Sequence, residues 1–347
     1  MSIVLVCDGA LEQYSCHRFA DAWRQAGRDC LVVGPAMAGE LPLPHRPCDL
    51  SLHPKELLGS TVLEHANAIG LFLRNPDDIE AITTGYRALR RSQGLWTAPI
   101  FSGPLIPLAG DDLIDAFLRR LSCDLMIVSG DDQLKQLEAM ASLWPAELTK
   151  PQVMATGFWF PTTPPAPPSP KPLLVALLQS GIPTHIGAKE QLIRLLKRWA
   201  REQSEWTIVL QPDHPWSSTP TLETDNTSYP TNVVEAAPEQ MLGLLRRCTA
   251  CLSVSSPWSL VAMMGGRIPV VVGDYGIQAE QHTTSFFGCG AMHRLRDLGG
   301  LHKIQELPLV NQGWLEAMGG SIQNGPARLL FALDTLRQMT TAPLPVR

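Results

Sequence analysis

Short apolar runs alternate with amphipathic segments along the whole chain. The first run, Ser2–Cys7, ends at Asp8-Gly9, and residues 14–25 that follow carry apolar side chains at helical spacing. A second strand is expected over 29–34. Strand, helix and strand in this order are typical of a doubly wound parallel sheet, in which helices cover both faces of the strands.

The same alternation continues to about residue 160 and begins again near residue 173. In the first half the pattern predicts helices over 79–91, 111–121 and 133–143 and strands over 98–101, 124–128 and 151–155. In the second half it predicts helices over 189–201, 238–248 and 257–264 and strands over 173–178, 206–210, 232–234, 252–254 and 268–272. A last helix is expected over 327–339. The chain is therefore an α/β protein with two parallel sheets.

Between the two halves the composition changes abruptly, because seven prolines lie between residues 161 and 172. Such a stretch favours an extended, semi-rigid spacer, and 347 residues suit two domains of about 150 residues each. We expect an N-terminal Rossmann-like domain over 1–160, a linker over 161–172, a C-terminal Rossmann-like domain over 173–325, and a tail over 326–347 that packs back on the first domain.

Composition limits the possible partners. The net charge is −5 and charged residues make up 18% of the chain, so extended nucleic-acid binding is not expected. The local basic group Arg87-Ala-Leu-Arg90-Arg91 is expected to be a solvated helix face. Eight scattered cysteines indicate reduced, buried thiols, and Cys248-x-x-Cys251 lacks the second ligand pair of a zinc site, so we expect no metal and no cofactor.

The beginning of the chain carries no basic segment before its apolar run, and no stretch of 18 apolar residues is present. These features predict a cytoplasmic protein without a transmembrane segment, and peripheral attachment to the inner membrane is the alternative.

The most informative stretch follows the expected strand at 252–254. Ser255 and Ser256 end this strand, Pro257 suits the first position of a helix, and Gly265-Gly266 ends that helix. Free backbone N–H groups and hydroxyls at a helix N-terminus form an anion site, so these serines are predicted to hold a nucleotide phosphate. The simpler alternative is that Ser256 only caps the helix.

Other polar residues of the second half also follow strands, where parallel strands bring their ends to one edge. His214-Pro215 could donate to the phosphate, with His214 as a general acid for the leaving phosphate. The remaining candidates for the nucleotide are Gln179, Gln211, Asp274, Tyr275 and Gly276.

In the first half the corresponding residues would contact an acceptor. Asp8 is the leading candidate for a general base, because Gly9 lets a ligand approach the backbone closely. Asp131 and the adjacent Asp132 are the alternatives, and either could instead cap a helix. The acceptor side would further include Ser102, Gly103, Ser129 and Gly130. The chain has no Gly-x-Gly-x-x-Gly after its first strand, no Walker loop and no Gly-x-Ser-x-Gly elbow.

The order of several motifs resembles a glycosyltransferase of the GT-B architecture, and in particular an uncharacterised family of bacterial glycosyltransferases. The motifs are Cys7-Asp8-Gly9, Pro99-Ile-Phe-Ser-Gly-Pro104, Cys123-Asp-Leu-Met-Ile-Val128, Ser253-Val-Ser-Ser256, Gly266-Arg-Ile-Pro-Val270, Gly273-Asp-Tyr-Gly276 and Phe286-Phe-Gly-Cys-Gly290. The resemblance implies two Rossmann-like domains that face each other across a cleft, and a reaction class without a defined substrate.

A second resemblance is to bacterial sialyltransferases, which carry an acidic-Gly element, a His-Pro and a Ser-Ser. His214-Pro215 and Ser255-Ser256 match in order, and the resemblance implies that they serve the phosphate of a CMP-sugar. The acidic element departs from the pattern, because no acid precedes Asp8-Gly9 and no glycine follows Asp131-Asp132.

Together these observations predict inverting, metal-independent transfer of a sugar from a nucleotide-sugar to the hydroxyl of a glycan or lipid-linked acceptor, in cell-surface polysaccharide biosynthesis. A CMP-sugar is the first expected donor and a UDP-sugar the second. Two alternatives remain open: a nucleotide-sugar epimerase of the same architecture, and a two-lobed protein that binds a ligand without catalysis.

Overall fold

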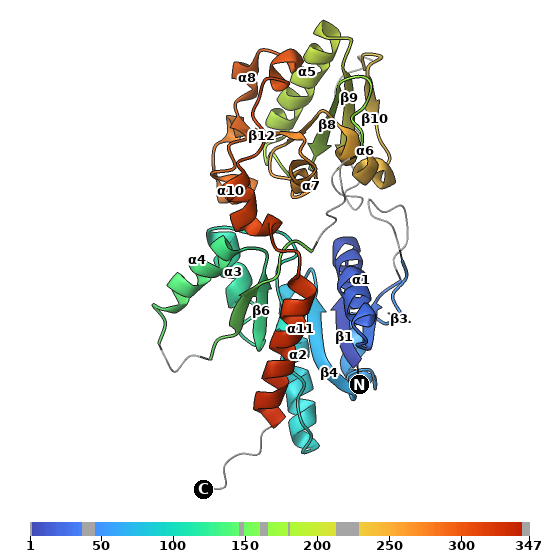
Figure 1. The fold of residues 1–347 in the computed structure, drawn as a ribbon, viewed down its shortest axis with the longest axis vertical. Helices are drawn as coiled ribbons and strands as arrows, with labels where there is room; N and C mark the ends of the chain where they lie inside the picture. The colour runs from blue at the N-terminus through green and yellow to red at the C-terminus, as the bar shows by residue number, and fades with distance from the viewer. Residues whose placement is uncertain are drawn as a thin grey trace. The chain divides into compact units, whose positions relative to one another are not determined.

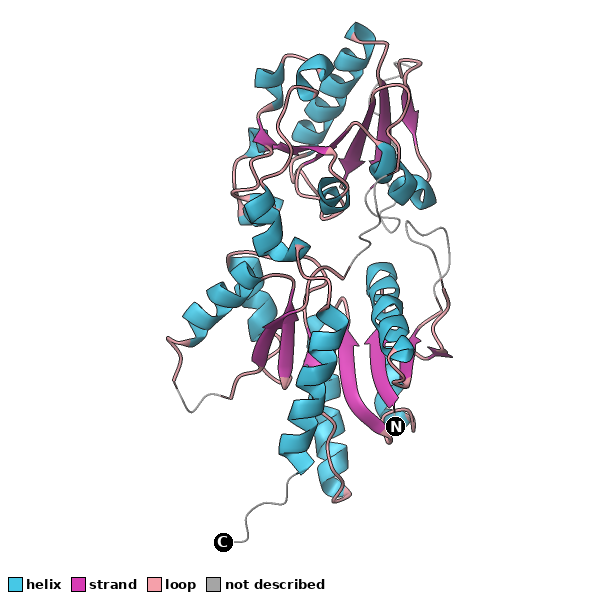
Figure 2. Ribbon diagram, viewed as in Figure 1, coloured by secondary structure: helices cyan, strands magenta, loops and turns pink. Residues whose placement is uncertain are grey.

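The computed structural model describes residues 2–36, 46–145, 149–159, 166–179, 181–212 and 229–341. The chain divides into two compact units (Figure 1). Unit 1 contains the described residues up to 159 and the segment from Glu316 onward, and unit 2 contains the described residues from 166 to Leu315. Each unit is a parallel sheet with helices on its faces (Figure 2), as the alternating pattern predicts.

Unit 1 is built on a seven-stranded sheet in the order β3-β2-β1-β4-β5-β6-β7, with every pair parallel. The strands are β1 (Ser2–Cys7), β2 (Cys30–Gly34), β3 (Leu50–Ser51), β4 (Ala66–Phe72), β5 (Ile100–Ser102), β6 (Leu125–Val128) and β7 (Gln152–Ala155). The strands β1 and β6 are buried on both faces, which explains why they read as continuous apolar runs.

Helices cover the two faces of this sheet. They are α1 (Ala10–Gln25), α2 (Pro76–Ser92), α3 (Asp111–Leu118), α4 (Asp131–Ala141) and α11 (Gly325–Thr341), with a 3-10 turn at Pro54–Gly59. Alternate residues of β1 belong to different cores: Ile3 and Leu5 pack with α1 and α11, whereas Val4 and Val6 pack with α2. This alternation is the two-residue period of a strand.

The C-terminal helix α11 is part of unit 1. Its Leu329 and Leu333 lie in the same core as Phe19 and Trp159. The Trp23 indole donates to the Pro326 carbonyl at 2.7 Å, which ties the start of α11 to α1. The path of the chain therefore runs from unit 1 to unit 2 and back.

Unit 2 is built on a six-stranded parallel sheet in the order β10-β9-β8-β11-β12-β13. The strands are β8 (Leu173–Leu178), β9 (Thr207–Pro212), β10 (Val233–Glu235), β11 (Ala250–Ser253), β12 (Ile268–Val272) and β13 (Met292–His293). Its helices are α5 (Ile186–Glu202), α6 (Met241–Arg247), α7 (Ser259–Met264), α8 (Leu295–Leu298), α9 (Leu301–Ile304) and α10 (Gln312–Leu315). In the described part of the proline-rich stretch, Ala166 and Ser169 donate their N–H groups to backbone carbonyls at the end of α6.

Several elements differ from the sequence prediction. The pattern missed β4, the central strand of unit 1, because Asn67 and Gly70 interrupt its apolar run. It also missed the two-residue strands β3 and β13, which are too short to show a period. Helix α1 begins at Ala10, one turn earlier than expected.

None of the described helices is both long and apolar enough to cross a lipid bilayer. All eight cysteines are free thiols, and all except the half-buried Cys48 are buried.

Candidate functional site

A carboxyl pair lies at the carboxyl edge of the unit 1 sheet, where β1 and β4 end side by side. Asp8 follows β1, and its Oδ1 accepts a hydrogen bond from the Arg74 backbone N–H at 2.8 Å. The Arg74 guanidinium also approaches the same oxygen, with Nε at 3.7 Å. Arg74 follows β4, so the parallel pairing of β1 and β4 is what brings these two residues together.

The second carboxyl of the pair is Glu12, in the first turn of α1. Burial, helped by the negative charge of Asp8, raises the pKa of Glu12 to about 7, against the opposing effects of the Glu12 backbone N–H and Arg74. A carboxyl group that titrates near neutral pH can both take up and release a proton during a reaction. Asp8 is among the residues expected from the sequence, whereas Glu12 is not.

Gly9 has a different role from the one expected. A methyl group built at Gly9 would collide with the carboxylate of Glu12 and crowd the side chain of Arg74. The missing side chain therefore makes room for Glu12, and the Glu12 carboxylate occupies the space that was predicted to admit a ligand.

Replacing Gly9 with Ala is expected to push the Glu12 carboxylate out of its buried position without unfolding unit 1, because the backbone of Gly9 is extended (φ −134°) and suits alanine. The pKa of Glu12 should then fall from about 7 toward its ordinary value of 4.5. An NMR titration of the side-chain carboxyl carbons measures this change. Gly59→Ala, where a methyl group meets nothing within 4 Å, is the control.

The other residues predicted for the acceptor side serve the fold. Ser102 is fully buried; its hydroxyl donates to the Leu71 carbonyl at 2.6 Å and accepts from Arg120 Nε at 3.0 Å. Gly103 lies against the backbone of Ile127. These contacts join β4, β5 and β6 and leave the Ser102 hydroxyl enclosed by protein.

Ser129 and Gly130 are covered by the returning C-terminal segment. Both of their N–H groups donate to Gln133 Oε1, at 2.8 and 3.0 Å. The backbone of residues 317–319 lies directly over Gly130, which has no room for a side chain. The sequence could not show this contact, because it depends on the return of a segment about 190 residues later in the chain.

Asp131 and Asp132 are exposed in the first turn of α4, and Asp132 accepts from Gln136 at 3.0 Å. They follow β6, which is three strands from β1 in the sheet. At about 4.8 Å per strand, this places them on the order of 14 Å from the end of β1. The structure thus separates these two candidates from the Asp8–Glu12 pair.

In unit 2 the structure brings together two of the residues predicted to bind the nucleotide, Gln179 at the end of β8 and Ser255 at the end of β11. Gln179 Oε1 accepts from the Ser255 backbone N–H at 3.0 Å, and Gln179 Nε2 donates to the Ser255 hydroxyl at 3.3 Å. The adjacent strands β8 and β11 position this pair.

Ser256 is not the cap of a helix that begins at Pro257. It is fully buried, and its hydroxyl accepts from the Trp258 N–H at 3.2 Å within a turn. Helix α7 begins only at Ser259, after Trp258. The Ser256 hydroxyl therefore shapes the turn between β11 and α7, because Pro257 and Trp258 form a separate turn before the helix.

The turn after β12 is held mainly by its own side chains. Asp274 Oδ2 accepts from the Leu295 N–H at 2.7 Å, at the start of α8, and the Tyr275 hydroxyl donates to the Ala188 carbonyl at 3.2 Å. Gly276 has a positive φ of 76°, and its carbonyl accepts from the Thr283 hydroxyl at 3.0 Å. Asp274 and Tyr275 thus have structural partners within unit 2.

Two of the central predictions, His214 and Pro215, lie outside the described residues. Gln211 is buried in β9. A further residue that the sequence analysis did not select is His293, which ends β13 beside Val272 of β12. Burial lowers the pKa of His293, and no hydrogen-bond partner for its buried Nε2 is present in the described part of the chain. Because β13 has only two residues, its sequence shows no strand pattern that would place His293 at this edge.

Within the ranges that the structure describes, no group of three or more His, Cys, Asp or Glu side chains is arranged to hold a metal ion. The polar groups that the structure brings together at strand ends are Asp8, Glu12 and Arg74 in unit 1, and Gln179 and Ser255, which bond to each other, in unit 2.

Solved structures of low sequence identity share this fold. The UDP-N-acetylglucosamine 2-epimerase from Rickettsia bellii matches with a TM-score of 0.68 at 11% identity, over 99% of each chain. The UDP-GlcNAc 2-epimerase from Neisseria meningitidis, bound to UDP-GlcNAc, matches with a TM-score of 0.64 at 12% identity, over 96% of this chain and all of that one. The glycotransferase of kitacinnamycin matches with a TM-score of 0.54 at 10% identity, over 97% and 98% of the two chains.

These similarities establish the two-sheet, Rossmann-like GT-B fold. No curated protein matches the sequence. A protein-family model, in contrast, matches residues 79–319, which is more than half of the chain. The protein therefore belongs to the family described as "Putative glycosyltransferase (DUF6716)".

Proposed function

We propose that the protein transfers a sugar from a nucleotide-sugar to a hydroxyl acceptor, with Glu12 as the general base. The observation that supports this assignment is the Glu12 carboxyl, whose pKa of about 7 results from burial and from the neighbouring Asp8. Asp8 is the positioning residue in this proposal, and its interaction with Arg74 fixes its place.

The proposed reaction is a single displacement. The acceptor oxygen forms a bond to the anomeric carbon of the sugar while the bond from that carbon to the nucleotide phosphate breaks. The acceptor proton passes to Glu12, and the electron pair of the broken bond leaves with the nucleotide. A carboxyl with a pKa near 7 is about half deprotonated at neutral pH, and its deprotonated form is a stronger base than an ordinary carboxylate.

For the donor, we assign the first contact to Gln179 and Ser255 in unit 2. Ser256 shapes the turn and makes no contact with the nucleotide in this proposal, and His214 remains a proposed phosphate contact. A UDP-sugar is the first donor to test, because a structure with the same fold holds UDP-GlcNAc. A CMP-sugar is the second, on the motifs His214-Pro215 and Ser255-Ser256.

The carboxyl pair also supports a second candidate, a nucleotide-sugar epimerase. Inverting a carbon centre by proton transfer requires one group that removes a proton and one that returns it. Asp8 and Glu12 are two such groups at one strand edge. This reaction would consume the nucleotide-sugar without an acceptor.

One incubation series distinguishes the two candidates. The protein is mixed with UDP-, CMP- and GDP-sugars, with and without glycan acceptors, and the products are separated by mass spectrometry. Nucleotide release that rises with acceptor, together with a glycosylated product, supports transfer. A changed sugar stereochemistry with deuterium taken up from D₂O supports the epimerase instead. If a nucleotide-sugar binds but undergoes neither reaction, both candidate functions are contradicted.

Replacing Asp8 with Asn is expected to shift the acidic limb of the pH–rate profile to lower pH. The Asp8 charge raises the pKa of Glu12 in the wild type, so its removal lowers that pKa below about 7. Because a base works in its deprotonated form, activity should then persist further into the acidic range. The measurement is kcat between pH 5 and 9. Asp131→Asn, which alters the rival base on α4, should leave the profile unchanged.

Replacing Ser255 with Ala is expected to weaken binding of the nucleotide by about 2- to 10-fold, the effect of losing one neutral hydrogen bond. Isothermal titration calorimetry with UDP and CMP measures this change. Ser256→Ala is the matched control, since its hydroxyl is fully buried and already bonded to Trp258. Equal weakening by both variants would contradict the assignment of Ser255 as the contact.

A further inference from the structure

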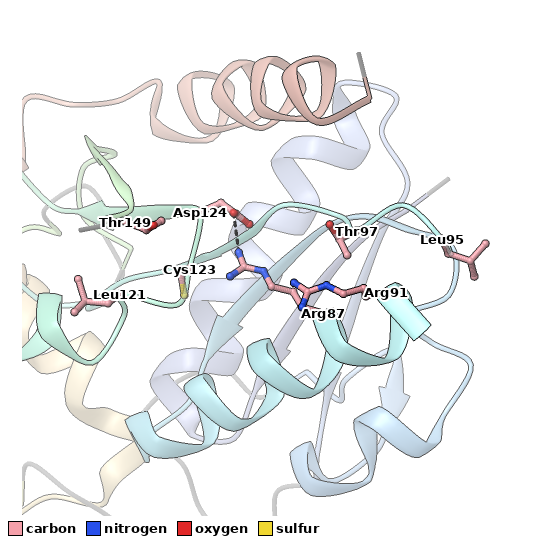
Figure 3. Close-up of a pocket in the computed structure, with 8 residues that line it drawn as sticks. All are labelled: Arg87, Arg91, Leu95, Thr97, Leu121, Cys123, Asp124 and Thr149. Atoms are coloured by element: carbon pink, nitrogen blue, oxygen red, sulfur yellow. Dashed lines mark hydrogen bonds and ion pairs between the residues drawn. The ribbon is translucent and has the colours of Figure 1, made fainter. Parts of the chain in front are cut away.

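A cavity of about 460 Å³ lies in unit 1 at the edge of the sheet opposite the carboxyl pair (Figure 3). Three of its lining residues, Thr97, Asp124 and Thr149, precede the strands β5, β6 and β7. Asp8, in contrast, follows β1. In a parallel sheet these are opposite edges, so this cavity is separate from the candidate active site.

The charges in the cavity do not balance. Asp124 is fully engaged, because its Oδ1 pairs with Arg87 at 2.7 Å and its Oδ2 accepts from the Ile100 N–H at 2.7 Å. Arg87 also donates to the Ser122 carbonyl at 2.6 Å. Arg91 is the second guanidinium of the cavity, and among the residues that the structure describes it has neither an ion pair nor a hydrogen bond from its side chain.

Arg91 is exposed at the cavity, so its guanidinium is available to an anion from solution. Arg87 and Arg91 are four residues apart on α2, so they project from the same face of the helix. Figure 3 shows both guanidinium groups on the cavity side of α2. Arg87 is already paired with Asp124, so Arg91 is the guanidinium of the cavity whose charge is left for a ligand.

We propose that this cavity binds a small molecule through a phosphate group. The Arg91 guanidinium supplies the charge, and the hydroxyls of Thr97 and Thr149 supply two further donors from other walls of the cavity. A phosphate can accept hydrogen bonds from a guanidinium and from hydroxyl groups together, and the bonds to the charged group are the stronger ones. The volume lies within the range of about 300–1,000 Å³ that is usual for small-molecule sites. Leu95, 48% exposed, offers an apolar contact for the organic part of the ligand.

The test uses glycerol 3-phosphate as a free phosphate monoester, titrated into the full-length protein by calorimetry in a chloride buffer at pH 7.5. Arg91→Gln is expected to weaken binding at least tenfold. Arg90→Gln removes the same charge from the neighbouring position of the same helix and should change the affinity by less than about threefold. Thr97→Val provides a second variant that keeps both arginines, and it should also weaken binding.

A second arm replaces the free ligand by vesicles that contain phosphatidic acid, with phosphatidylcholine vesicles as the blank. Binding of glycerol 3-phosphate that depends on Arg91 identifies a site for a free phosphate ester. Arg91-dependent binding to phosphatidic acid alone identifies a lipid headgroup as the source of the phosphate. Absence of binding in both arms, or equal loss in Arg91→Gln and Arg90→Gln, overturns the proposal.

Discussion

Replacing Glu12 with Gln is expected to lower kcat for sugar transfer by about 100- to 10,000-fold, the usual contribution of a general base. Glutamine has nearly the same shape but cannot accept the proton of the acceptor hydroxyl at any pH of interest. Affinity for the nucleotide should stay within about threefold of the wild type, because Glu12 belongs to unit 1 and the proposed nucleotide contacts belong to unit 2. Initial rates with a saturating donor, alongside calorimetric binding of the nucleotide, provide both values.

The matched control for this variant is Glu80→Gln, which makes the same chemical change at an exposed position of α2. It should retain full activity. If Glu12→Gln kept more than about a tenth of the wild-type kcat, Glu12 would not be the base, and Asp8 would return as the leading candidate.

Replacing Gly319 with Ala is expected to cost about 3–5 kcal/mol of unfolding free energy, which is exceptional for a single methyl group. Gly319 has a positive φ of 114°, and a side chain there would collide with the carbonyl of Ser129. The added methyl group would meet backbone atoms of Ser129, which cannot rotate away as a side chain could. The collision can be relieved only by shifting the returning segment or the end of β6. Urea denaturation of the two proteins gives the difference in free energy.

Gly94→Ala separates the two causes of that loss. Gly94 also has a positive φ, of 64°, but a methyl group there meets nothing within 4 Å. Gly94→Ala should lower the unfolding free energy by only about 1 kcal/mol, because it adds the strain of the backbone conformation alone. If Gly319→Ala lowers the unfolding free energy no more than Gly94→Ala does, then the collision with Ser129 adds nothing to the backbone strain, and the prediction is wrong.

Much of the fold could be predicted from the sequence, because buried parallel strands and amphipathic helices leave strong local patterns. The run at Leu173–Leu178 and the helical spacing within 189–201 correspond to β8 and to part of α5. β4 could not be recognised in the same way. Its sequence, Ala-Asn-Ala-Ile-Gly-Leu-Phe, becomes a central strand only through pairing with β1 and β5.

The candidate site was harder to predict, because its key property arises from tertiary structure. Glu12 is an ordinary helix residue in the sequence, and its pKa of about 7 depends on burial and on the charge of Asp8. A local signal did exist: an acid, a glycine and a second acid at Asp8, Gly9 and Glu12. The structural partners of Asp274 and Tyr275, from α8 and α5, left no comparable pattern.

The most direct measurement of the central claim is the pH dependence of kcat for the wild-type protein beside that of Glu12→Gln. We predict that the wild-type rate rises with pH through an apparent pKa near 7, and that this limb is absent from the small residual activity of Glu12→Gln. An unchanged limb near pH 7 in Glu12→Gln would show that a group other than Glu12 takes the acceptor proton.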